Sequence, residues 1–389
     1  MDVIKVSHDQ WQEIFQLSMY AFQYDLSDKE LEEKRHNLKE HQILGIYENN
    51  QLAAKLHIRP FQVYQRSEPI KMGGIASVST YPEYRRRGYV KQLLLASLEE
   101  MRKNGQLLSM LHPFSISFYR KFGYEIFSEN IRVQMKQADL IPINSDKIGG
   151  KIIRLRKEQF HEALHDIYDA FAQSHSGMLV RSKEWWQKSV LKNVAAAIYF
   201  GEKGEPLGYL LYDVKERRME VKEFIILQHE ARTELWRFVC QHDSMIDTLT
   251  MNINKDEPLL YTLKNPQVKT ELTPYFMTRI VDVEAYLLQY PFQIQSDDSL
   301  QLHIEDPYAP WNEGVYEISR QSIKKVRNVS EQQREKCLTL TINALTALLL
   351  GYQTAQQLSD IGEILGPIEQ VLELAGIVPK QSTYFPDFF

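Results

Sequence analysis

The order of predicted strands and helices repeats along this chain, and the repetition constrains the fold more than any other feature. The first third predicts a helix over 9–22, a hairpin over 43–64, a strand over 73–81, a helix over 87–105, a strand over 106–113, a short helix over 115–123 and a strand over 124–135. Asn49 and Asn50 supply turn residues that tolerate positive φ. Strands that alternate with helices predict a mixed α/β sheet.

A short, polar and turn-rich stretch over 137–151 follows, and its composition favours a linker. The same order then returns, with a helix over 158–173, a hairpin over 196–214, a strand over 218–228 and a helix over 231–242. We therefore expect a structural repeat, with one domain over 1–138 and a second over 150–281. Strands followed by buried helices over 282–389 predict a third, α+β domain, and 389 residues are enough for all three.

Composition excludes several classes of protein. The net charge of -5 gives no overall basic field for nucleic acid. The two cysteines, Cys240 and Cys337, form neither a disulfide framework nor a metal-binding spacing, which suits a reducing cytoplasm. The N-terminus lacks the apolar core of a signal peptide, and the most apolar stretch, 343–352, is shorter than the roughly 20 residues that cross a bilayer. We expect a soluble, cytoplasmic protein with no membrane partner.

Three arginines at 85–87 lead into Gly88 where a predicted strand ends and a predicted helix begins. A helix N-terminus offers unpaired N–H groups and the positive end of the helix dipole, which together bind phosphate. Gly88 allows the backbone to approach an oxygen without a Cβ in the way, and arginines add charged donors. The alternative is a solvated charge cluster at a helix end. The position of the run, between strand and helix, favours a phosphate site.

The stretch VSTYPEYRRRGYV, 78–90, resembles the pyrophosphate loop of GCN5-related N-acetyltransferases, which bind acetyl-coenzyme A (acetyl-CoA). Val90 stands where that pattern has its last small residue. An R-R-R-G followed by two apolar or aromatic residues resembles one branch, the Eis-type (enhanced intracellular survival) acetyltransferases. That branch has two acetyltransferase-like domains and a C-terminal sterol-carrier-like domain, so the resemblance covers the whole chain.

The resemblance implies acetyl-CoA as cosubstrate, no metal, and contacts at three places. The end of one strand pairs its backbone with the pantetheine arm, the arginine loop surrounds the pyrophosphate, and two residues after the next strand line the other side. In that order the residues are Val78, Ser79 and Thr80; Arg86, Arg87, Gly88, Tyr89, Val90 and Lys91; and Phe114 and Ser115.

The stretch FYRKFGYE, 118–125, resembles the second acetyltransferase motif, in which a tyrosine lies near the cofactor sulfur. Attack by an amine on a thioester expels a thiolate, and a phenol with a pKa near 10 retains a proton to give it. Tyr119 is the candidate acid. The alternative is an aromatic that packs a short helix onto the sheet, which is the interpretation we prefer for Tyr124.

The chain given ends in YFPDFF, 384–389, an unusually apolar terminus. In the resembled family the C-terminal carboxylate is the base that takes the proton of the attacking amine, which implies this role for Phe389. Burial between aromatic rings would raise the pKa of that carboxyl from about 3.5. Proton transfer through a water is an alternative, and so is a purely structural anchor. Asp387 is a candidate for attracting polyamines, and Asp25 for recruiting the amine.

The second domain lacks the phosphate loop. At the corresponding place, 225–236, it has no glycine and no arginine triplet, and Glu230 would repel an anion. We therefore expect one cofactor site per chain and a structural second domain.

Two further signals carry less weight. His161 and His165 match the H-E-x-x-H zinc pattern, with Glu162 as the base of a metalloprotease. Both histidines lie on the shoulder of the apolar face, and Glu184 is only an arithmetical third ligand, so we assign no zinc. The stretch 339–358 resembles the sterol-carrier-like fold; the alternatives there are lipid carriage and a simple buried core.

The sequence predicts an acetyl-CoA-dependent N-acetyltransferase that acts on primary amines by direct attack, since neither cysteine falls in the candidate site. The resemblance implies aminoglycosides as acceptors and a homo-oligomer, hexameric or trimeric; lysine side chains and polyamines stay open. The rival hypothesis is a lipid- or coenzyme-sensing protein with vestigial transfer activity.

Overall fold

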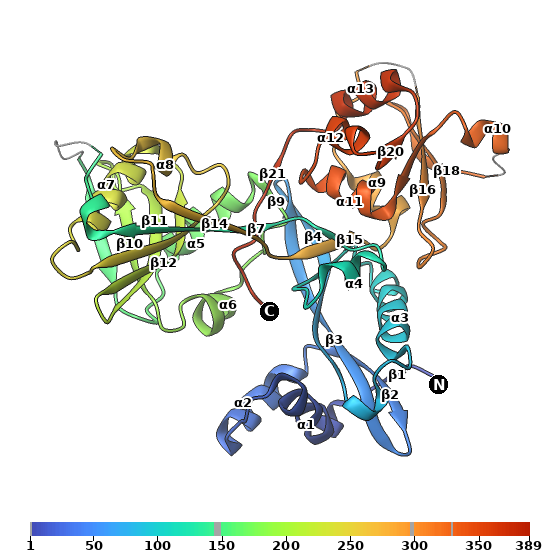
Figure 1. Cartoon of the computed structure of the whole chain (residues 1–389), viewed down its shortest axis with the longest axis horizontal. Helices are drawn as coiled ribbons and strands as arrows, with labels where there is room; N and C mark the ends of the chain where they lie inside the picture. Colours follow the sequence, from blue (N-terminus) through green and yellow to red (C-terminus); the bar gives the residue numbers. More distant parts are fainter. Residues whose placement is uncertain (1, 144–148, 296–298, 328–329) are drawn as a thin grey trace.

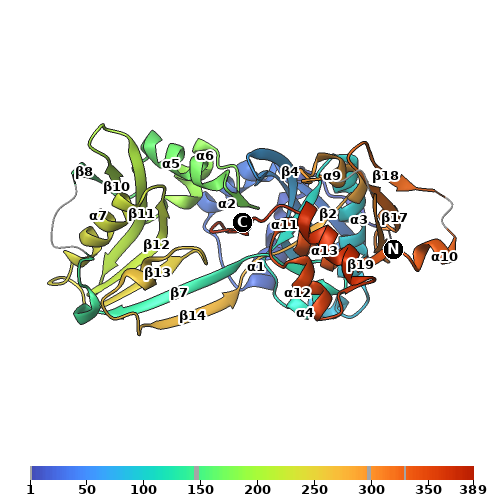
Figure 2. The ribbon, with the colours of Figure 1, turned by 90° about the horizontal axis from the view of Figure 1, so that it is seen from above.

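The computed structural model describes residues 2–143, 149–295, 299–327 and 330–389, which fold into three units that each contain one main sheet. Figure 1 shows the second unit at one end, the third at the opposite upper side, and the first unit below and between them. The C-terminus lies at the junction of the units rather than at an outer edge (Figures 1 and 2).

The first sheet has the order β1-β2-β3-β4-β5-β15-β6, in which only the β4–β5 pair is parallel. Its strands are β1 (Ile4–Lys5), β2 (Gln42–Glu48), β3 (Gln51–Gln65), β4 (Glu68–Thr80), β5 (Leu108–Leu111), β6 (Glu125–Ile126) and β15 (Met277–Ile280). Asn49 and Asn50, with φ of 51° and 62°, form the predicted turn of the β2–β3 hairpin.

Helices cover both faces of this sheet. α1 (Trp11–Phe22) packs on β3 and β4 from one side and contacts α2 (Asp28–Leu38), while α3 (Tyr89–Lys103) packs on β2, β3 and β4 from the other. α3 also makes the crossover between the parallel strands β4 and β5, and α4 (Ile116–Arg120) follows β5. The predicted helices of this region are therefore present.

The first two units exchange a strand. β7 (Glu129–Lys136) pairs in the second sheet, and β15, from a later segment, pairs between β5 and β6 in the first. The segments cross at Ser128, whose backbone oxygen accepts a hydrogen bond from Tyr275 N at 2.9 Å and whose Oγ accepts one from Phe276 N at 3.1 Å. The single strand predicted over 124–135 is therefore wrong, because β6 and β7 lie in different sheets. The boundary predicted at 138 falls after this change of sheet.

The second sheet has the order β14-β7-β13-β12-β11-β10-β8, with β12 and β13 parallel. Around this pair the order matches that of the first sheet, with β7 in the place of β15, so the predicted structural repeat is confirmed. Besides β7, the second unit contains β8 (Lys151–Leu155), α5 (Glu162–Ala172), β9 (His175–Ser176), α6 (Lys183–Trp185), β10 (Ala195–Phe200), β11 (Pro206–Lys215), β12 (Arg218–Ile226), α7 (His229–Cys240), β13 (Thr248–Ile253), α8 (Leu259–Thr262) and β14 (Lys269–Pro274).

The third unit is α+β, as predicted, with a sheet in the order β18-β17-β16-β19-β20. Its elements are α9 (Val283–Gln289), β16 (Leu300–Glu305), β17 (Gly314–Ile318), β18 (Ile323–Val326), α10 (Glu331–Arg334), β19 (Leu338–Thr341), α11 (Ile342–Leu350), α12 (Ala355–Asp360), β20 (Ile364–Leu365), α13 (Ile368–Ile377) and β21 (Ser382–Thr383). α11 packs on β15 and β6 as well as on β19, so the first and third units share a core. Within the described ranges, none of the helices has the length and apolar character needed to span a bilayer.

Candidate active site

The first sheet opens between β4 and β5. Their parallel pairing ends at Ile75 and Leu111, although β4 continues to Thr80. At this point β4 has a bulge, in which Ser77 and Val78 face a single residue of β3, and Ser77 has a φ of 52°. A bulge bends a strand and disrupts its ladder. β4 therefore diverges from β5, and among the described residues the two strands do not pair beyond Ile75 and Leu111.

A cavity of about 610 Å³ lies where the ends of α1 and β4 meet the N-terminus of α3. It is lined by Ala21, Phe22, Val78, Ser79, Thr80, Tyr84, Arg85, Arg86, Gly88, Tyr89, Val90, Lys91, Phe114 and Phe118. The structure thus brings together the residues predicted to bind the cofactor, with the exception of Arg87 and Ser115. The wall from α1 was missed, because no local signal connects Ala21 and Phe22 with a loop some 60 residues later.

Gly88 begins α3 in a left-handed conformation, with a φ of 79°. A Cβ there would meet nothing within 4 Å, so the backbone conformation favours glycine and the space around it stays open to a ligand. The preceding Arg86 is also left-handed, with a φ of 63°. The N-terminus of α3, where a helix carries the positive end of its dipole, therefore lies at the cavity that Arg85 and Arg86 line.

Arg87 is placed differently from the prediction. Its Nη1 lies 2.7 Å from Oε1 of Glu48, and its guanidinium lies over the ring of Tyr84. Oε2 of the same carboxylate accepts a hydrogen bond of 2.5 Å from the hydroxyl of Tyr89. These hydrogen bonds, that of Tyr89 first, lower the pKa of Glu48. Arg87 thus fixes the loop to β2, while Arg85, which the prediction omitted, lines the cavity.

Tyr119 lies behind the cavity wall rather than on it. Its ring packs edge-on against Phe114 at 5.3 Å and Phe118 at 5.2 Å, and the side chain is 2% exposed. Burial raises the pKa of its hydroxyl, so the phenol keeps its proton. Ser115 caps the short α4, with its Oγ 3.4 Å from Phe118 N. Tyr124 is fully buried beside Ser109, as expected for a core aromatic.

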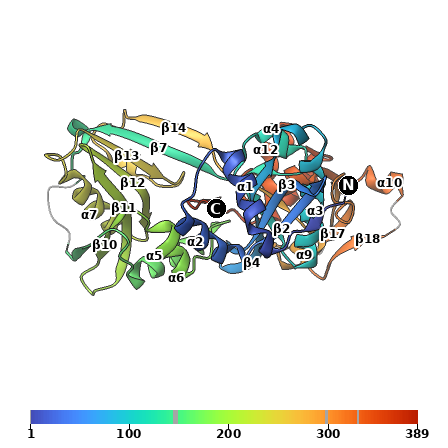
Figure 3. The ribbon, with the colours of Figure 1, turned by 90° about the horizontal axis from the view of Figure 1, so that it is seen from below.

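The final residue lies against the first sheet. A Cβ on Gly74 of β4 would come within 2.6 Å of the Phe389 ring, so this glycine leaves the space that the ring occupies. The ring also packs against Phe61 at 4.8 Å and Phe276 at 5.1 Å. Phe388 is 63% exposed and contacts His112, which follows β5. Seen from above and from below, the C-terminus lies between the first and second units (Figures 2 and 3).

Asp387, predicted to attract polyamines, is buried rather than exposed to solvent. The side chain is buried, with Oδ1 3.0 Å from Nε of Arg181 and 2.7 Å from Nε1 of Trp185. Arg181 is also fully buried and pairs with Glu223. One guanidinium thus lies between two buried carboxylates, Asp387 and Glu223. The aspartate instead fastens the tail to the second unit, to which β21 also pairs through β9.

The remaining predicted positions lie away from the cavity. Asp25 is exposed between α1 and α2. Glu230 lies in the first turn of α7, where it accepts a hydrogen bond from Tyr199 at 3.4 Å. His161 is the N-cap of α5, with extended backbone, and its Nδ1 accepts from Ala163 N at 3.1 Å, so it does not share a helical face with His165. Over the described residues, no group of three His, Cys, Asp or Glu side chains is arranged to hold a metal.

Models of three domain families match the chain. An acetyltransferase (GNAT) domain matches residues 2–127, a second acetyltransferase (GNAT) domain matches 177–280, and a sterol carrier protein domain matches 283–386. An uncharacterized N-acetyltransferase of Streptomyces avermitilis is 21% identical over 391 residues, covering 94% of this chain and 92% of its own.

Solved structures extend the likeness to the whole chain. A protein of unknown function from Enterococcus faecalis, described as a probable N-acyltransferase, has a TM-score of 0.91 at 28% identity and covers 100% of this chain and 99% of its own. Eis1 from Mycobacterium abscessus has a TM-score of 0.80 at 18% identity, with 100% of each chain covered, and shares the fold.

The chain therefore belongs to the GCN5-related N-acetyltransferases. Its two domains of this kind and the sterol carrier protein domain that follows them form the Eis-type architecture, as the sequence predicted.

Proposed function

We propose that this protein transfers the acetyl group of acetyl-CoA to a primary amine by direct attack of the amine on the thioester. The observation that carries the proposal is the cavity between the end of β4 and the N-terminus of α3, which joins a phosphate-binding loop to an open sheet. Only the first of the two acetyltransferase domains has this loop, so we propose one site per chain.

The residues of the cavity fit acetyl-CoA at both of its ends. Gly88, Arg85 and Arg86 surround a helix N-terminus, the donor set that a pyrophosphate needs. Val78, Phe114 and Phe118 give the cavity an apolar surface suited to the pantetheine arm, and the end of β4, beyond its pairing with β5, is the backbone that we propose for contacts with the amides of that arm. When bound, the molecule supplies an acetyl group activated as a thioester.

Two groups handle protons in this proposal. Tyr119 holds its proton firmly and donates it toward the leaving sulfur as negative charge develops there. The carboxylate of Phe389 takes the proton of the amine, directly or through a water, and the ring of the same residue is held by Gly74, Phe61 and Phe276. The buried pair of Asp387 with Arg181 supports this role, because it holds the preceding residues in place.

The proposed acceptors are primary amines, with aminoglycosides, polyamines and lysine side chains as the candidates. Asp387 is buried against Arg181, and Asp25 is the exposed carboxylate that we propose for recruiting the amine. A homo-oligomer in a reducing cytoplasm completes the proposal, in accord with the two free cysteines, and light scattering tests the oligomer.

The test is release of free thiol from acetyl-CoA in the presence of a panel of single amines, polyamines and aminoglycosides. We expect thiol release that depends on the amine, with one acetylated product per thiol. Binding of acetyl-CoA without thiol release for any amine would instead favour a coenzyme-sensing protein.

A further inference from the structure

A row of polar side chains lies along one face of β3 beneath α1. Lys55, His57 and Arg59 alternate along the strand, and Arg59 pairs across the sheet with Gly74 of β4, over which the Phe389 ring lies. Side chains two residues apart on a strand share a face. The row and the C-terminal tail therefore occupy the same face of the first sheet.

Lys55 is fully buried and has only neutral partners. Its Nζ lies 2.8 Å from Ser77 Oγ, 3.2 Å from the Ser77 carbonyl oxygen and 3.2 Å from Nε2 of His57. In the described part of the chain, no carboxylate lies within ion-pairing distance of it. Burial lowers the pKa of this amine to about 7, so near neutral pH a substantial fraction is uncharged and can accept a proton.

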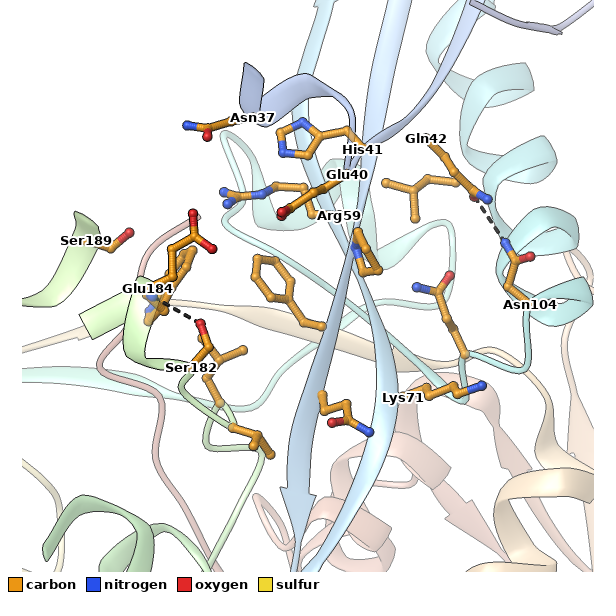
Figure 4. A pocket seen from close by; sticks show the side chains of 18 of the residues that line it. Asn37, Glu40, His41, Gln42, Arg59, Lys71, Asn104, Ser182, Glu184 and Ser189 are labelled. Carbon is orange, nitrogen blue, oxygen red and sulfur yellow. Dashed lines mark hydrogen bonds between the residues drawn. The ribbon is translucent and has the colours of Figure 1, made fainter. Parts of the chain in front are cut away.

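The two imidazoles continue the row. Nδ1 of His57 lies 3.2 Å from Nδ1 of His41, which follows α2. His41 lines a second cavity of about 630 Å³ between the first and second units, together with Arg59 and Glu40 (Figure 4). Burial lowers the pKa of His41 to about 3 and that of His57 further below its ordinary value, with Arg59 and His8 adding repulsion. Both rings are therefore neutral and able to pass a proton.

The other end of the row lies at the wall of the cofactor cavity. Ser77 is the bulged residue next to Val78, which lines that cavity, and its Oγ lies 3.1 Å from Oγ of Ser18 in α1. Ser18 is one helical turn before Ala21 and Phe22, which line the same cavity. The side chains from Ser77, which is adjacent in sequence to the cavity-lining Val78, to His41 in the second cavity are thus joined through hydrogen-bond distances of 2.8 to 3.2 Å.

We propose that Lys55, His57 and His41 form a second proton path, which takes the proton of the attacking amine at Ser77 and releases it into the cavity between the units. The path rests on the acetyl transfer proposed above. It gives the proton a second route out, beside the carboxylate of Phe389.

Each step balances. As the bond from the amine nitrogen to the acetyl carbon forms, an N–H bond breaks and its proton goes to Ser77 Oγ, which gives its own proton to neutral Lys55. The ammonium passes a proton to Nε2 of His57, Nδ1 of His57 passes its proton to Nδ1 of His41, and His41 releases one from Nε2 to water. One proton leaves the amine and one reaches solvent. Both imidazoles finish as the opposite neutral tautomers, and in each ring a proton must be lost from one nitrogen and regained at the other, by exchange with water, before the next cycle.

The kinetic test compares His41→Gly with wild type, using one amine acceptor and thiol release as the readout. We expect kcat to fall at least about tenfold and to recover when imidazole is added, because imidazole enters the cavity that His41 lines. His8→Gln is the matched control, since His8 Nε2 contacts the His41 carbonyl oxygen but lies outside the row, and its kcat should not change. An unchanged kcat in His41→Gly, or a fall in kcat that imidazole does not reverse, would overturn the proton path but not the acetyl transfer.

The second readout does not depend on activity. The side-chain NMR signal of Lys55, in protein labelled at lysine, should titrate near pH 7. Titration near the ordinary pKa of lysine would overturn the proposal, because a permanently charged Lys55 cannot accept a proton. If none of the amines in the panel caused the wild-type protein to release thiol, the proposed function and the proton path would both be overturned. A negative result for His41→Gly or for the Lys55 titration would overturn the proton path and leave the acetyl transfer intact.

Discussion

Asp387 Oδ1 lies 3.0 Å from Nε of Arg181, and this buried ion pair joins the last residues of the chain to the second acetyltransferase domain. Neither residue reaches solvent, and the same arginine pairs with Glu223 of β12. The second acetyltransferase domain, which lacks the phosphate loop, thus has a structural role. It holds the C-terminal tail against the sheet of the first domain, which has the loop.

Breaking this pair should release the tail. Arg181→Met removes the guanidinium that pairs with two buried carboxylates, and loss of one member of a buried pair costs about 3–5 kcal/mol. We expect that loss in the free energy of unfolding by denaturant titration, together with a lower kcat and an unchanged Kd for acetyl-CoA. Lys188→Met is the control, because it removes an exposed pair with Glu184 that is worth about 0.5 kcal/mol or less. Equal effects of the two variants would contradict the account.

Removing the hydroxyl of Tyr119 should lower turnover and leave acetyl-CoA affinity nearly intact. The ring of Tyr119→Phe still packs against Phe114 and Phe118, so the cavity wall keeps its shape. Loss of a general acid typically costs about 10²-fold or more in kcat. Tyr124→Phe, which removes a buried hydroxyl beside Ser109, should leave turnover unchanged. Unchanged turnover in Tyr119→Phe would remove this residue from the reaction.

Adding a few residues after Phe389 should lower kcat strongly. The extension replaces the carboxylate of Phe389, the residue whose ring packs on Phe61 and Phe276, with a neutral amide and moves the terminal charge away. Acetyl-CoA should still bind, because the phosphate loop is untouched. Measurement of kcat and of the Kd for acetyl-CoA in the extended protein separates the two effects. Acetylation at the native rate would exclude the carboxylate of Phe389 as the base.

Lys55 should make stability depend on pH. Its pKa is about 7 in the folded protein and 10.5 ordinarily, so between these values the unfolded chain binds more protons and stability rises with pH. The free-energy cost of burying the protonated form of this lysine is therefore fully present below pH 7. Lys55→Met should raise Tm most at pH 6 to 7 and little near pH 10, with exposed Lys103→Met as control. A difference in Tm that is the same across this range would contradict the lowered pKa.

Hydrophobic and turn patterns were sufficient to predict most elements, since Asn49 and Asn50 mark a hairpin and the apolar face of α1 marks a helix. They could not predict the exchange of β7 for β15, because pairing between segments some 140 residues apart leaves no local pattern. The strand over 124–135 was continuous in the sequence only because Phe127 and Ser128, at the crossing, are also compatible with a strand.

In the candidate site, too, local features could be predicted from the sequence, whereas contacts between distant segments could not. A local motif located Gly88 and Arg86, and the structure brings them to one cavity with Val78 and Phe114. Contacts made across the fold were misjudged: Arg87 pairs with Glu48 of β2, and Asp387 with Arg181. Burial of Lys55 was also invisible in the sequence, because a lysine in an amphipathic strand is ordinarily solvent-exposed.

Calorimetric titration of Gly88→Asp with acetyl-CoA tests the central claim most directly. The variant combines a left-handed backbone, which strains a side chain, with a negative charge where the pyrophosphate would lie. Gly105→Ala, at another left-handed glycine just after α3, is the control for backbone strain alone. We predict that the wild type and Gly105→Ala bind one acetyl-CoA per chain and that Gly88→Asp binds none. Normal binding by Gly88→Asp would contradict the assignment of this cavity.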